Sequence, residues 1–391
     1  MDNGILSGIR VVDCGTYIAG PAAAVVMSDF GAEVIKIERP PYGDPYRYLS
    51  LVPGMPVSPL PYCWILDGRN KKSVALDLND HGARQALLAI IRSADVFITN
   101  YQGPLVQKFR VAYQDLVPHN PRLIYAHLTG YGETGDDSNQ PGYDMTAYWA
   151  RSGLMQTMYN ADAEPAQSPV RRHHVGALSP RDYRARDEHH NVADGAWANA
   201  CSIQAALVGA EFLPKWTRST TVNPIVNHYV TRDQRRFITC CLDPKKDWPN
   251  LCRALDHPEL IDDPRFRTPE LRRANSAELV AIIDASVGSK DMAEWKEILR
   301  SNDVIWGPVP GTQQAAQDPQ MEVNGVFAEI EPGLRTVANP LTIAGVEKTK
   351  PRMAPEVGEH TAEVLLSVGL TEEAIHGLFE RGAALDSSKQ N

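Results

Sequence analysis

The sequence of 391 residues is long enough to bury a large core and to divide into two domains. Its 43% hydrophobic and 22% charged residues are typical of a soluble globular protein, and the formal net charge of −9 argues against a general nucleic-acid-binding protein. No apolar run approaches the roughly eighteen residues of a membrane helix, and the N-terminal stretch lacks the pattern of a signal peptide. We therefore expect a cytoplasmic protein with neither a nucleic-acid nor a membrane partner.

The first 130 residues alternate between strand and helix patterns. Helical patterns occupy 21–31 and 81–94. The β-branched and apolar runs that predict strands lie at 9–14, 32–38, 72–78, 95–99 and 122–130. This alternation predicts an α/β fold with a doubly wound, mostly parallel sheet, a Rossmann-like large domain.

Ligands of such sheets bind beyond the carboxyl ends of the strands. The loops expected there are interrupted by glycine or proline, which leaves backbone N–H groups free to face a ligand. These loops span 15–21, 37–45, 99–104 and 128–135. None contains the GxGxxG pattern of a dinucleotide site, which argues against a dehydrogenase.

The second half of the chain changes in character. An alanine-rich stretch at 195–212 predicts a helix on the sheet, and two short strands are expected around a turn at 232–234. Amphipathic helices should follow, then strand-like alternation at 327–345, a closing helix at 371–382 and a frayed end from Leu385. The expected domains are the first part of the large domain at 1–215, a smaller inserted α+β domain at 216–315, and a return to the large domain at 316–391.

Residues 168–190, SPVRRHHVGALSPRDYRARDEHH, differ from the sequence around them. They hold four of the eleven histidines, His173, His174, His189 and His190. Adjacent histidines on a strand point to opposite faces and chelate poorly, so we expect no metal site. The six cysteines show no CxxC spacing and are expected to be buried thiols.

Eight segments between residue 6 and about residue 310 resemble, in order and spacing, the family III CoA-transferases, also called the CaiB/BaiF family. That family includes formyl-CoA:oxalate transferase and the α-methylacyl-CoA racemases. The segments are LSGIRVVDCGTYIAGPAAAVVMSDFGAEVIKIERPPYGDPYR, NKKSVALDL, ADVFITNYQGP, LIYAHLTGYGETG, PGYDMTAYWARSGLM, NPIVNHYVTRDQRRFITCC, DDPRF and WGPVP. The resemblance implies an interlocked homodimer that uses acyl-CoA and a carboxylic acid as substrates, with no permanently bound cofactor.

Coenzyme A carries phosphates, so its site needs fixed cations and backbone N–H donors. We expect the cations at the strand ends to converge on these phosphates, although solvated surface charges would explain any single one of them. The CoA-binding residues that the resemblance and the strand-end loops indicate are Ile18, Ala19, Arg39, Lys71, Lys72, Asn100, Tyr101, Lys108 and Tyr131.

The loop YGETG resembles the family's glycine loop, which covers the thioester; a plain β-turn would also explain it. Gly132 and Gly135 are therefore assigned to the catalytic site, where nearby backbone N–H groups would stabilise oxyanions. Three aromatic residues are expected to line the acyl pocket, or else to pack in the core: Tyr17, Tyr148 and Trp149.

The racemases of this family have a histidine where this chain has Tyr143. Tyrosine, with a reference pKa of about 10, is a poor base near neutral pH, which favours a transferase over a racemase. The following Asp144 is expected to cap a helix.

Transferases of the family use an aspartate nucleophile that forms an aspartyl-CoA thioester. It normally sits in a Gly-Asp pair, which is missing from the atypical segment 169–194, so Asp182 and Asp187 are weak candidates. Alternatively the segment is read out of frame. The Arg-Arg-His-His of residues 171–174 can be encoded as CGG CGA CAC CAC, and the same bases read one position later encode Gly-Asp-Thr. If the sequence is real, Pro180 should break any helix and leave a loop. The second reading of function is a catalytically impaired CoA-binding homologue, and the third is a racemase or epimerase.

Overall fold

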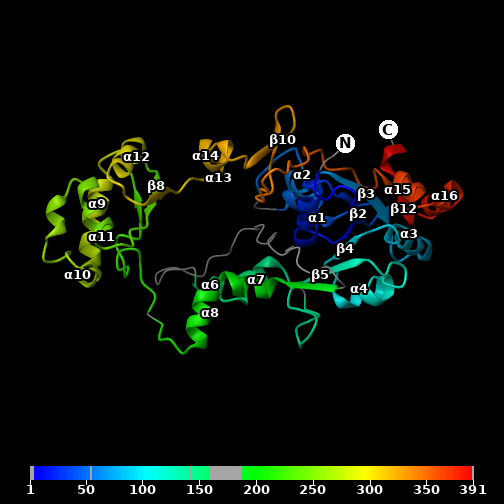
Figure 1. Cartoon of the computed structure of the whole chain (residues 1–391), viewed down its shortest axis with the longest axis horizontal. Coiled ribbons are helices and arrows are strands. Elements are labelled where there is room, and N and C mark those ends of the chain that lie inside the picture. Colours follow the sequence, from blue (N-terminus) through cyan, green and yellow to red (C-terminus); the bar gives the residue numbers. More distant parts are fainter. Residues whose placement is uncertain (1–3, 53–54, 141, 158–185, 213, 390–391) are drawn as a thin grey trace. The chain divides into compact units, whose positions relative to one another are not determined.

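The computed structural model describes residues 4–52, 55–140, 142–157, 186–212 and 214–389 (Figure 1). The chain divides into two compact units. The first combines Met1–Met155 and Asn324–Asn391 with a stretch that ends at Ala205, and the second consists mainly of Ala206–Val323. The limits expected for the smaller domain, 216 and 315, both lie inside the second unit.

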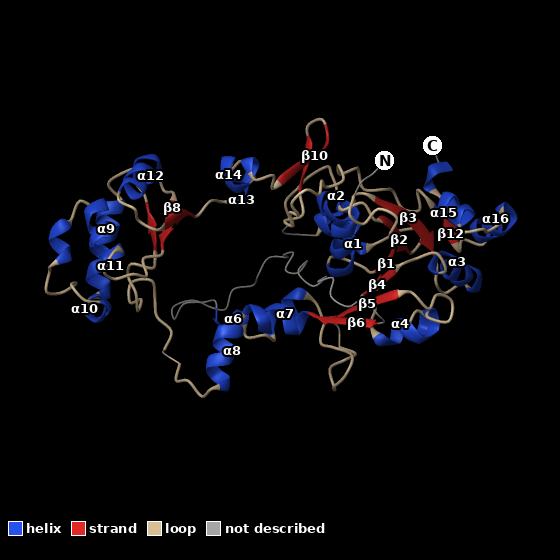
Figure 2. Ribbon diagram, viewed as in Figure 1, coloured by secondary structure: helices blue, strands red, loops and turns tan. Residues whose placement is uncertain are grey.

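A seven-stranded sheet forms the centre of the first unit (Figure 2). Its order is β12-β3-β2-β1-β4-β5-β6, and all neighbouring pairs are parallel except β12 with β3. Without β12 the order is 3-2-1-4-5-6, that of doubly wound nucleotide-binding sheets. The largely parallel α/β sheet is therefore confirmed. The strands are β1 (Arg10–Cys14), β2 (Glu33–Glu38), β3 (Lys71–Leu76), β4 (Val96–Thr99), β5 (Ile124–Thr129), β6 (Arg186–His190) and β12 (Ala384–Leu385).

Alternate residues of the strands pack on opposite faces of the sheet, and helices cover both. Val11 and Ile98 pack with Ala24 of α1 on one face. Val12 and Phe97 lie on the other, in a core shared with α3, α15 and α16. The period-two alternation thus explains why both layers of helices are needed. These helices are α1 (Ala19–Asp29), α3 (His81–Ile91), α15 (Thr361–Ser367) and α16 (Glu372–Glu380).

Shorter elements connect the strands of this unit. They are η1 (Pro45–Leu51), α2 (Tyr62–Gly68), α4 (Gly103–Phe109), α5 (Tyr113–Leu116), η2 (Asp144–Ala150), α6 (Leu154–Thr157), α7 (Asn191–Ala198), α8 (Ala200–Leu207), the hairpin β10 (Phe327–Glu331) with β11 (Leu334–Val337), and η4 (Ser387–Lys389). The single helix expected at 195–212 is two helices, interrupted at Asn199, whose side-chain amide donates to the carbonyl of Ser152.

Two sequence-based expectations about chain segments are wrong. Leu385 does not fray, because it pairs with Ala75 where β12 extends the sheet beyond β3. The stretch 186–190 is not a loop, since it forms β6 and its backbone pairs in parallel with β5. The rest of the atypical segment up to residue 185 lies outside the described residues, as do His173, His174 and Pro180.

The second unit contains a three-stranded antiparallel sheet packed against helices. Its core surrounds the buried Phe237, Trp248 and Trp295. The predicted turn between its first two strands is confirmed, with Gln234 in a left-handed conformation at φ 59°. The elements are β7 (His228–Val230), β8 (Arg236–Thr239), β9 (Trp306–Pro308), α9 (Asp247–Ala254), η3 (Pro258–Ile261), α10 (Pro269–Ala274), α11 (Ser276–Val287), α12 (Met292–Ser301), α13 (Thr312–Ala315) and α14 (Pro319–Val323).

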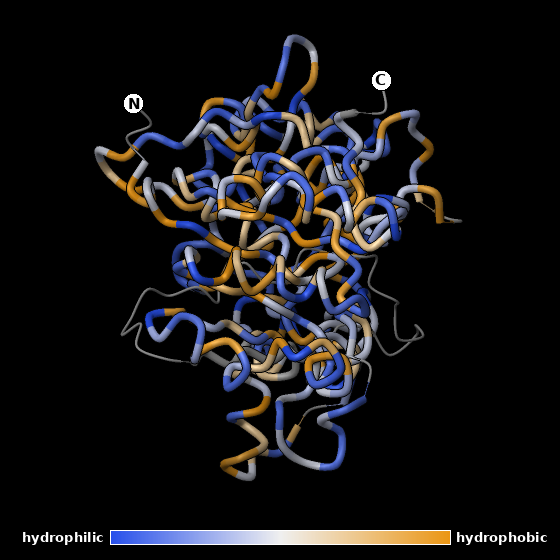
Figure 3. The backbone as a smooth tube through the Cα atoms, turned by 90° about the vertical axis from the view of Figure 1, so that its right-hand side faces the viewer, coloured by the Kyte–Doolittle hydropathy of each residue, from blue (hydrophilic) through white to orange (hydrophobic). Residues whose placement is uncertain are grey.

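Hydrophobic stretches occur in the packed elements and in some peripheral loops (Figure 3). Leu51 and Val57 are exposed in the first unit, and Leu207 and Phe212 are exposed near the start of the second. The cysteines described are mostly buried, as expected, but Cys240 is exposed because it lies just beyond the end of β8. Within the parts of the chain that the structure describes, every helix is too short or too polar to cross a bilayer.

Candidate functional site: the strand ends of the parallel sheet

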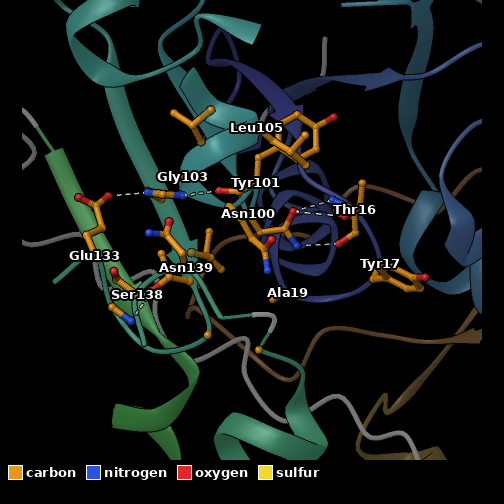
Figure 4. A pocket seen from close by; sticks show the side chains of 18 of the residues that line it. Thr16, Tyr17, Ala19, Asn100, Tyr101, Gly103, Leu105, Glu133, Ser138 and Asn139 are labelled. Carbon is orange, nitrogen blue, oxygen red and sulfur yellow. Dashed lines mark hydrogen bonds and ion pairs between the residues drawn. The ribbon is translucent and has the colours of Figure 1, made fainter. Parts of the chain in front are cut away.

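The carboxyl ends of β1 and β4 lie side by side at the point where the strand order reverses. Ligands of doubly wound sheets bind at this position. Two hydrogen bonds join the turns that follow the strands: the Thr16 N–H donates to Asn100 Oδ1 over 2.8 Å, and Asn100 Nδ2 donates to the Thr16 carbonyl over 2.8 Å (Figure 4). The two turns therefore form one continuous edge.

A cavity of about 1040 Å³ opens at this edge. It is at the upper end of the range of ligand pockets. Its walls come from the turn after β1, the turn and helix α4 after β4, the loop after β5, and the start of η2. Among the described lining residues His127 is the one basic side chain, and Glu133 and Asp144 are the carboxylates. The lining is therefore largely neutral.

A network of buried ion pairs holds the turn after β1, on one side of this cavity. Lys71 Nζ lies 2.8 Å from Asp13 Oδ2, and Lys36 Nζ lies 2.9 Å from Asp44 Oδ2. Lys36 also donates to the carbonyl of Gly15, and Asp44 accepts from the backbone N–H of Tyr17 at 3.0 Å. The network therefore fixes the backbone that borders the cavity.

Glu38 extends the network toward β3. It accepts two hydrogen bonds from Arg47, at 2.9 and 2.7 Å, and one from the Ser73 hydroxyl at 2.6 Å. It also accepts from the backbone N–H of Asp44 at 2.8 Å. All of these charged side chains are almost fully buried, so each depends on its partners.

Burial and ion pairing shift the pKa values of this network in opposite directions. Burial would raise the pKa of Asp13, but the ammonium groups of Lys36 and Lys71 hold it below its usual value. Burial would likewise raise the pKa of Glu38, and Arg47 and Lys36 lower it. For Lys71 burial dominates and lowers the pKa to about 8, in spite of Asp13.

Tyr17 occupies a strained backbone position at the cavity. Its φ of 59° is in the left-handed region, which is unfavourable for a bulky residue and is found mostly at functional sites. Its ring meets that of Tyr143 edge to face, with centroids 6.0 Å apart. This contact joins the turn after β1 to the start of η2.

The structure brings together part of the predicted CoA site. Five predicted residues line the cavity: Ile18, Ala19, Asn100, Tyr101 and Gly132. Tyr17 also lines it, as expected.

Other predicted residues lie elsewhere. Tyr148 and Trp149 are not among the lining residues, because Tyr148 is buried where η2 packs on Gly195 of α7. Gly135 and Tyr131 are also absent from the described lining; Gly135 has φ 89° in open space, and the Tyr131 ring packs under Arg151.

The two β3 lysines expected among the converging cations do not line the cavity. Lys71 is buried and donates to Asp13 and to the carbonyl of Pro21. Lys72 is paired with Glu33 and Glu363. Arg39 and Lys108 are exposed near the strand ends but do not line the cavity, and their roles stay predictions.

The carboxylates considered from sequence are placed as follows. Asp144 lines the cavity as the first residue of η2, so the expectation that it caps this helix is wrong: Tyr143 is the N-cap. Asp187 lies on β6 beside Ala126, and Asp182 lies outside the described residues. In the described ranges no cluster of three or more histidine, cysteine or carboxylate side chains could hold a metal ion.

Comparison with known proteins decides the family. The sequence matches CoA-transferase family III over residues 6–178 and 191–361. The chain belongs to this family. The family assignment expected from the strand-end motifs is therefore confirmed.

Two curated relatives of this family III chain are CoA-transferases that act on different acids. Cinnamoyl-CoA:phenyllactate CoA-transferase of Clostridium sporogenes is 28% identical over 96% of each chain. Succinyl-CoA:glutarate CoA-transferase of Mus musculus is 29% identical over 93% of this chain and 86% of its own length.

Solved structures agree with the fold. A CAIB/BAIF family protein from Brucella suis superposes with a TM-score of 0.79, over 94% of this chain and 100% of its own, at 23% identity. The hypothetical protein Rv3272 from Mycobacterium tuberculosis gives a TM-score of 0.75 over 92% of this chain and 99% of its own, at 28% identity.

The match to family III CoA-transferases omits residues 179–190. Both candidate nucleophiles, Asp182 and Asp187, fall in this gap. The family match therefore gives neither residue a family position. Sequence reasoning also missed His127 and the acidic partners of the buried network, because a lone histidine or a charge within a strand carries no pattern of its own.

Proposed function

We propose that this protein transfers coenzyme A from an acyl-CoA to a carboxylic acid. The observation that carries the proposal is the cavity at the β1–β4 switch point of a family III chain, lined by Ile18, Ala19, Asn100 and Tyr101. These are residues that the resemblance assigns to CoA. The named relatives act on different acids, so the acyl donor and acceptor are left open.

The charge of the cavity favours one orientation of coenzyme A. Its largely neutral described lining suits the uncharged pantetheine arm and an uncharged acyl group. The phosphates would lie outside it, near the exposed Arg39 and Lys108. The positive side chains of Arg39 and Lys108 would complement the negative charge of the phosphates.

The proposed chemistry is covalent. An aspartate carboxylate attacks the thioester carbonyl and releases CoA thiolate, which leaves a mixed anhydride. The thiolate then attacks the aspartyl carbonyl, giving aspartyl-CoA and the donor acid, and the acceptor carboxylate reverses these steps to take up the CoA. Backbone N–H groups of the 131–135 loop would stabilise the oxyanions. Asp187 and Asp182 are the candidate nucleophiles.

A catalytically impaired CoA-binding protein is the second candidate. The gap of the family match at 179–190 favours it, because the segment expected to carry the nucleophile is the one that departs from the family. A racemase is disfavoured by Tyr143, which lines the cavity at the position of the racemase base.

Mass spectrometry separates these functions. The protein is incubated with acetyl-CoA and succinyl-CoA, digested and searched for a CoA adduct on peptides covering 170–195, with Asp182→Asn and Asp187→Asn as matched variants. An adduct that one variant abolishes supports the transferase. Binding without any adduct supports the impaired homologue, and α-proton exchange with D₂O on a 2-methylacyl-CoA would support the racemase.

A homodimer is part of the proposal. The resemblance implies it, and exposed apolar side chains of the first unit such as Leu51 and Val57 are consistent with a surface that a second copy covers. Light scattering coupled to gel filtration should give twice the mass of 43.1 kDa. A monomer at micromolar concentration would contradict it.

A further inference from the structure

His127 occupies the wall of the cavity between two loops. It lies near the end of β5 and is 6% exposed. Its Nε2 lies 2.8 Å from the carbonyl oxygen of Tyr101, and its Nδ1 lies 2.5 Å from Glu133 Oε1. In Figure 4, one dashed line starts at Glu133 and another at Tyr101, and the two lines mark these interactions. The imidazole therefore bridges the loop after β5 and the turn after β4.

The two contacts constrain the protons of the bridge. A carbonyl oxygen only accepts, so Nε2 must carry a hydrogen that it donates to Tyr101. The second ring nitrogen then either donates to a Glu133 carboxylate from a doubly protonated imidazole, or accepts from a protonated Glu133. In both cases the ring is held at both nitrogens.

Other contacts hold the loop near its base, where the Tyr131 ring packs under Arg151. Gly130 approaches Gly142 so closely that an added Cβ would lie 2.6 Å from the Gly142 Cα. Beyond this crossing, Gly132 has φ 94° and its N–H donates to the Thr129 hydroxyl at 2.9 Å. The Glu133 side chain connects the tip of the loop, through His127, to the turn after β4.

We infer that His127 is a positioning residue that clamps the 130–135 loop onto the turn after β4 and thereby sets the width of the acyl-CoA cavity. This inference deepens the proposed function and rests on it for the identity of the ligand. His127 acts through Glu133 and Tyr101 and needs no contact with substrate. Loss of the clamp should widen the cavity. It should weaken binding of the thioester more than it lowers the rate at which the bound thioester reacts.

Two substitutions divide the bridge into halves. In His127→Asn the amide nitrogen replaces Nδ1, so the bond to Glu133 is kept and the bond to Tyr101 is lost. In His127→Gln the amide nitrogen replaces Nε2, so the bond to Tyr101 is kept and the bond to Glu133 is lost. The exposed His119, changed to Asn, is the matched control.

The readouts are KM and kcat for acetyl-CoA, or its Kd if no turnover is found. We expect His127→Gln to raise KM or Kd about tenfold and His127→Asn about threefold, since the bond to the carboxylate is the stronger. The kcat should change less than KM. Equal KM values in both variants and the wild type would overturn the inference, as would a fall in kcat with KM unchanged.

Hydrogen exchange in the ligand-free protein separates failure of the clamp from failure of the proposed function. Amides of 130–135 and 101–103 should exchange faster in both His127 variants than in the wild type and the His119 control. Unchanged exchange there overturns the clamp. Faster exchange in a protein whose wild type binds no acetyl-CoA would keep the clamp and overturn the function. Glu133→Ala, which removes the partner of Nδ1, should repeat the His127→Gln result if either histidine variant does not fold.

Discussion

The two sides of the switch point hold their loops in different ways. On the β1–β3 side, the turn that carries Tyr17 rests on fully buried ion pairs among Asp13, Lys36 and Asp44. On the β4–β5 side, the loops are held by a few partly buried hydrogen bonds of Asn100 and His127, two residues that line the cavity itself. The comparison teaches that one side is built to be rigid and the other to be adjustable. Substitutions should therefore affect stability on the first side and ligand binding on the second.

The largest effect is expected from Lys36. Replacing it with Met leaves Asp13 and Asp44 buried without their shared cation, which should lower the free energy of unfolding by about 3–5 kcal/mol. Urea unfolding measures this. Lys72→Met is the control: its partners Glu33 and Glu363 are partly exposed, so its effect should stay below about 1 kcal/mol. Similar losses for both lysines would contradict the contrast between buried and surface pairs.

Acid should weaken the same side. Because the pKa of Glu38 is lowered in the folded protein, the unfolded chain binds more protons at low pH, and the stabilisation is complete only above the ordinary value of 4.5. Asp13 behaves in the same way from its ordinary value of 3.8. The free energy of unfolding should therefore fall as the pH drops from about 5 toward about 3.

Glu38→Gln tests which group is responsible for this slope. The variant should be less stable at neutral pH, where it loses a charge-assisted partner of Arg47. Its stability should also depend less on pH below 5, because one of the two titrating groups is gone. A slope equal to that of the wild type would assign the acid effect to other carboxylates.

A smaller effect on stability is expected on the other side. Asn100→Ala removes both bonds to Thr16 and should lower the unfolding free energy by about 1–2 kcal/mol, since the site is only partly buried. Binding of acetyl-CoA should weaken at the same time, because the edge between the two turns is lost. Asn100→Asp keeps the acceptor for the Thr16 N–H and should bind better than the alanine variant. Equal binding by all three proteins would show that this edge does not form the site.

The fold could be predicted to a large extent from the sequence. The parallel strands were found because apolar β-branched runs and intervening helices leave strong periodic patterns. The two-residue edge strand β12 was missed because Ala384 and Leu385 carry no such pattern. Strand β6 was missed because its charged sequence, RDEHH, lacks the apolar β-branched run that identifies the other strands.

The site could be predicted only where it depends on the main chain. Ile18, Ala19 and Asn100 follow directly from the strand ends, so their positions come with the topology. The pairing of Lys71 was missed because its partner Asp13 lies 58 residues away in the sequence, and charge pairing across strands cannot be predicted without the register. His127 was missed for the same reason, since its partners define its role.

The most direct test of the central claim, that the cavity at the switch point binds acyl-CoA, is calorimetric titration of acetyl-CoA into the wild type and Ala19→Trp. Ala19 begins α1 and lines the cavity, so an indole there should fill it without touching the buried ion pairs. We expect the wild type to bind one acetyl-CoA per chain and the folded variant to bind none. Equal affinity in the two proteins would place the ligand elsewhere and contradict the account.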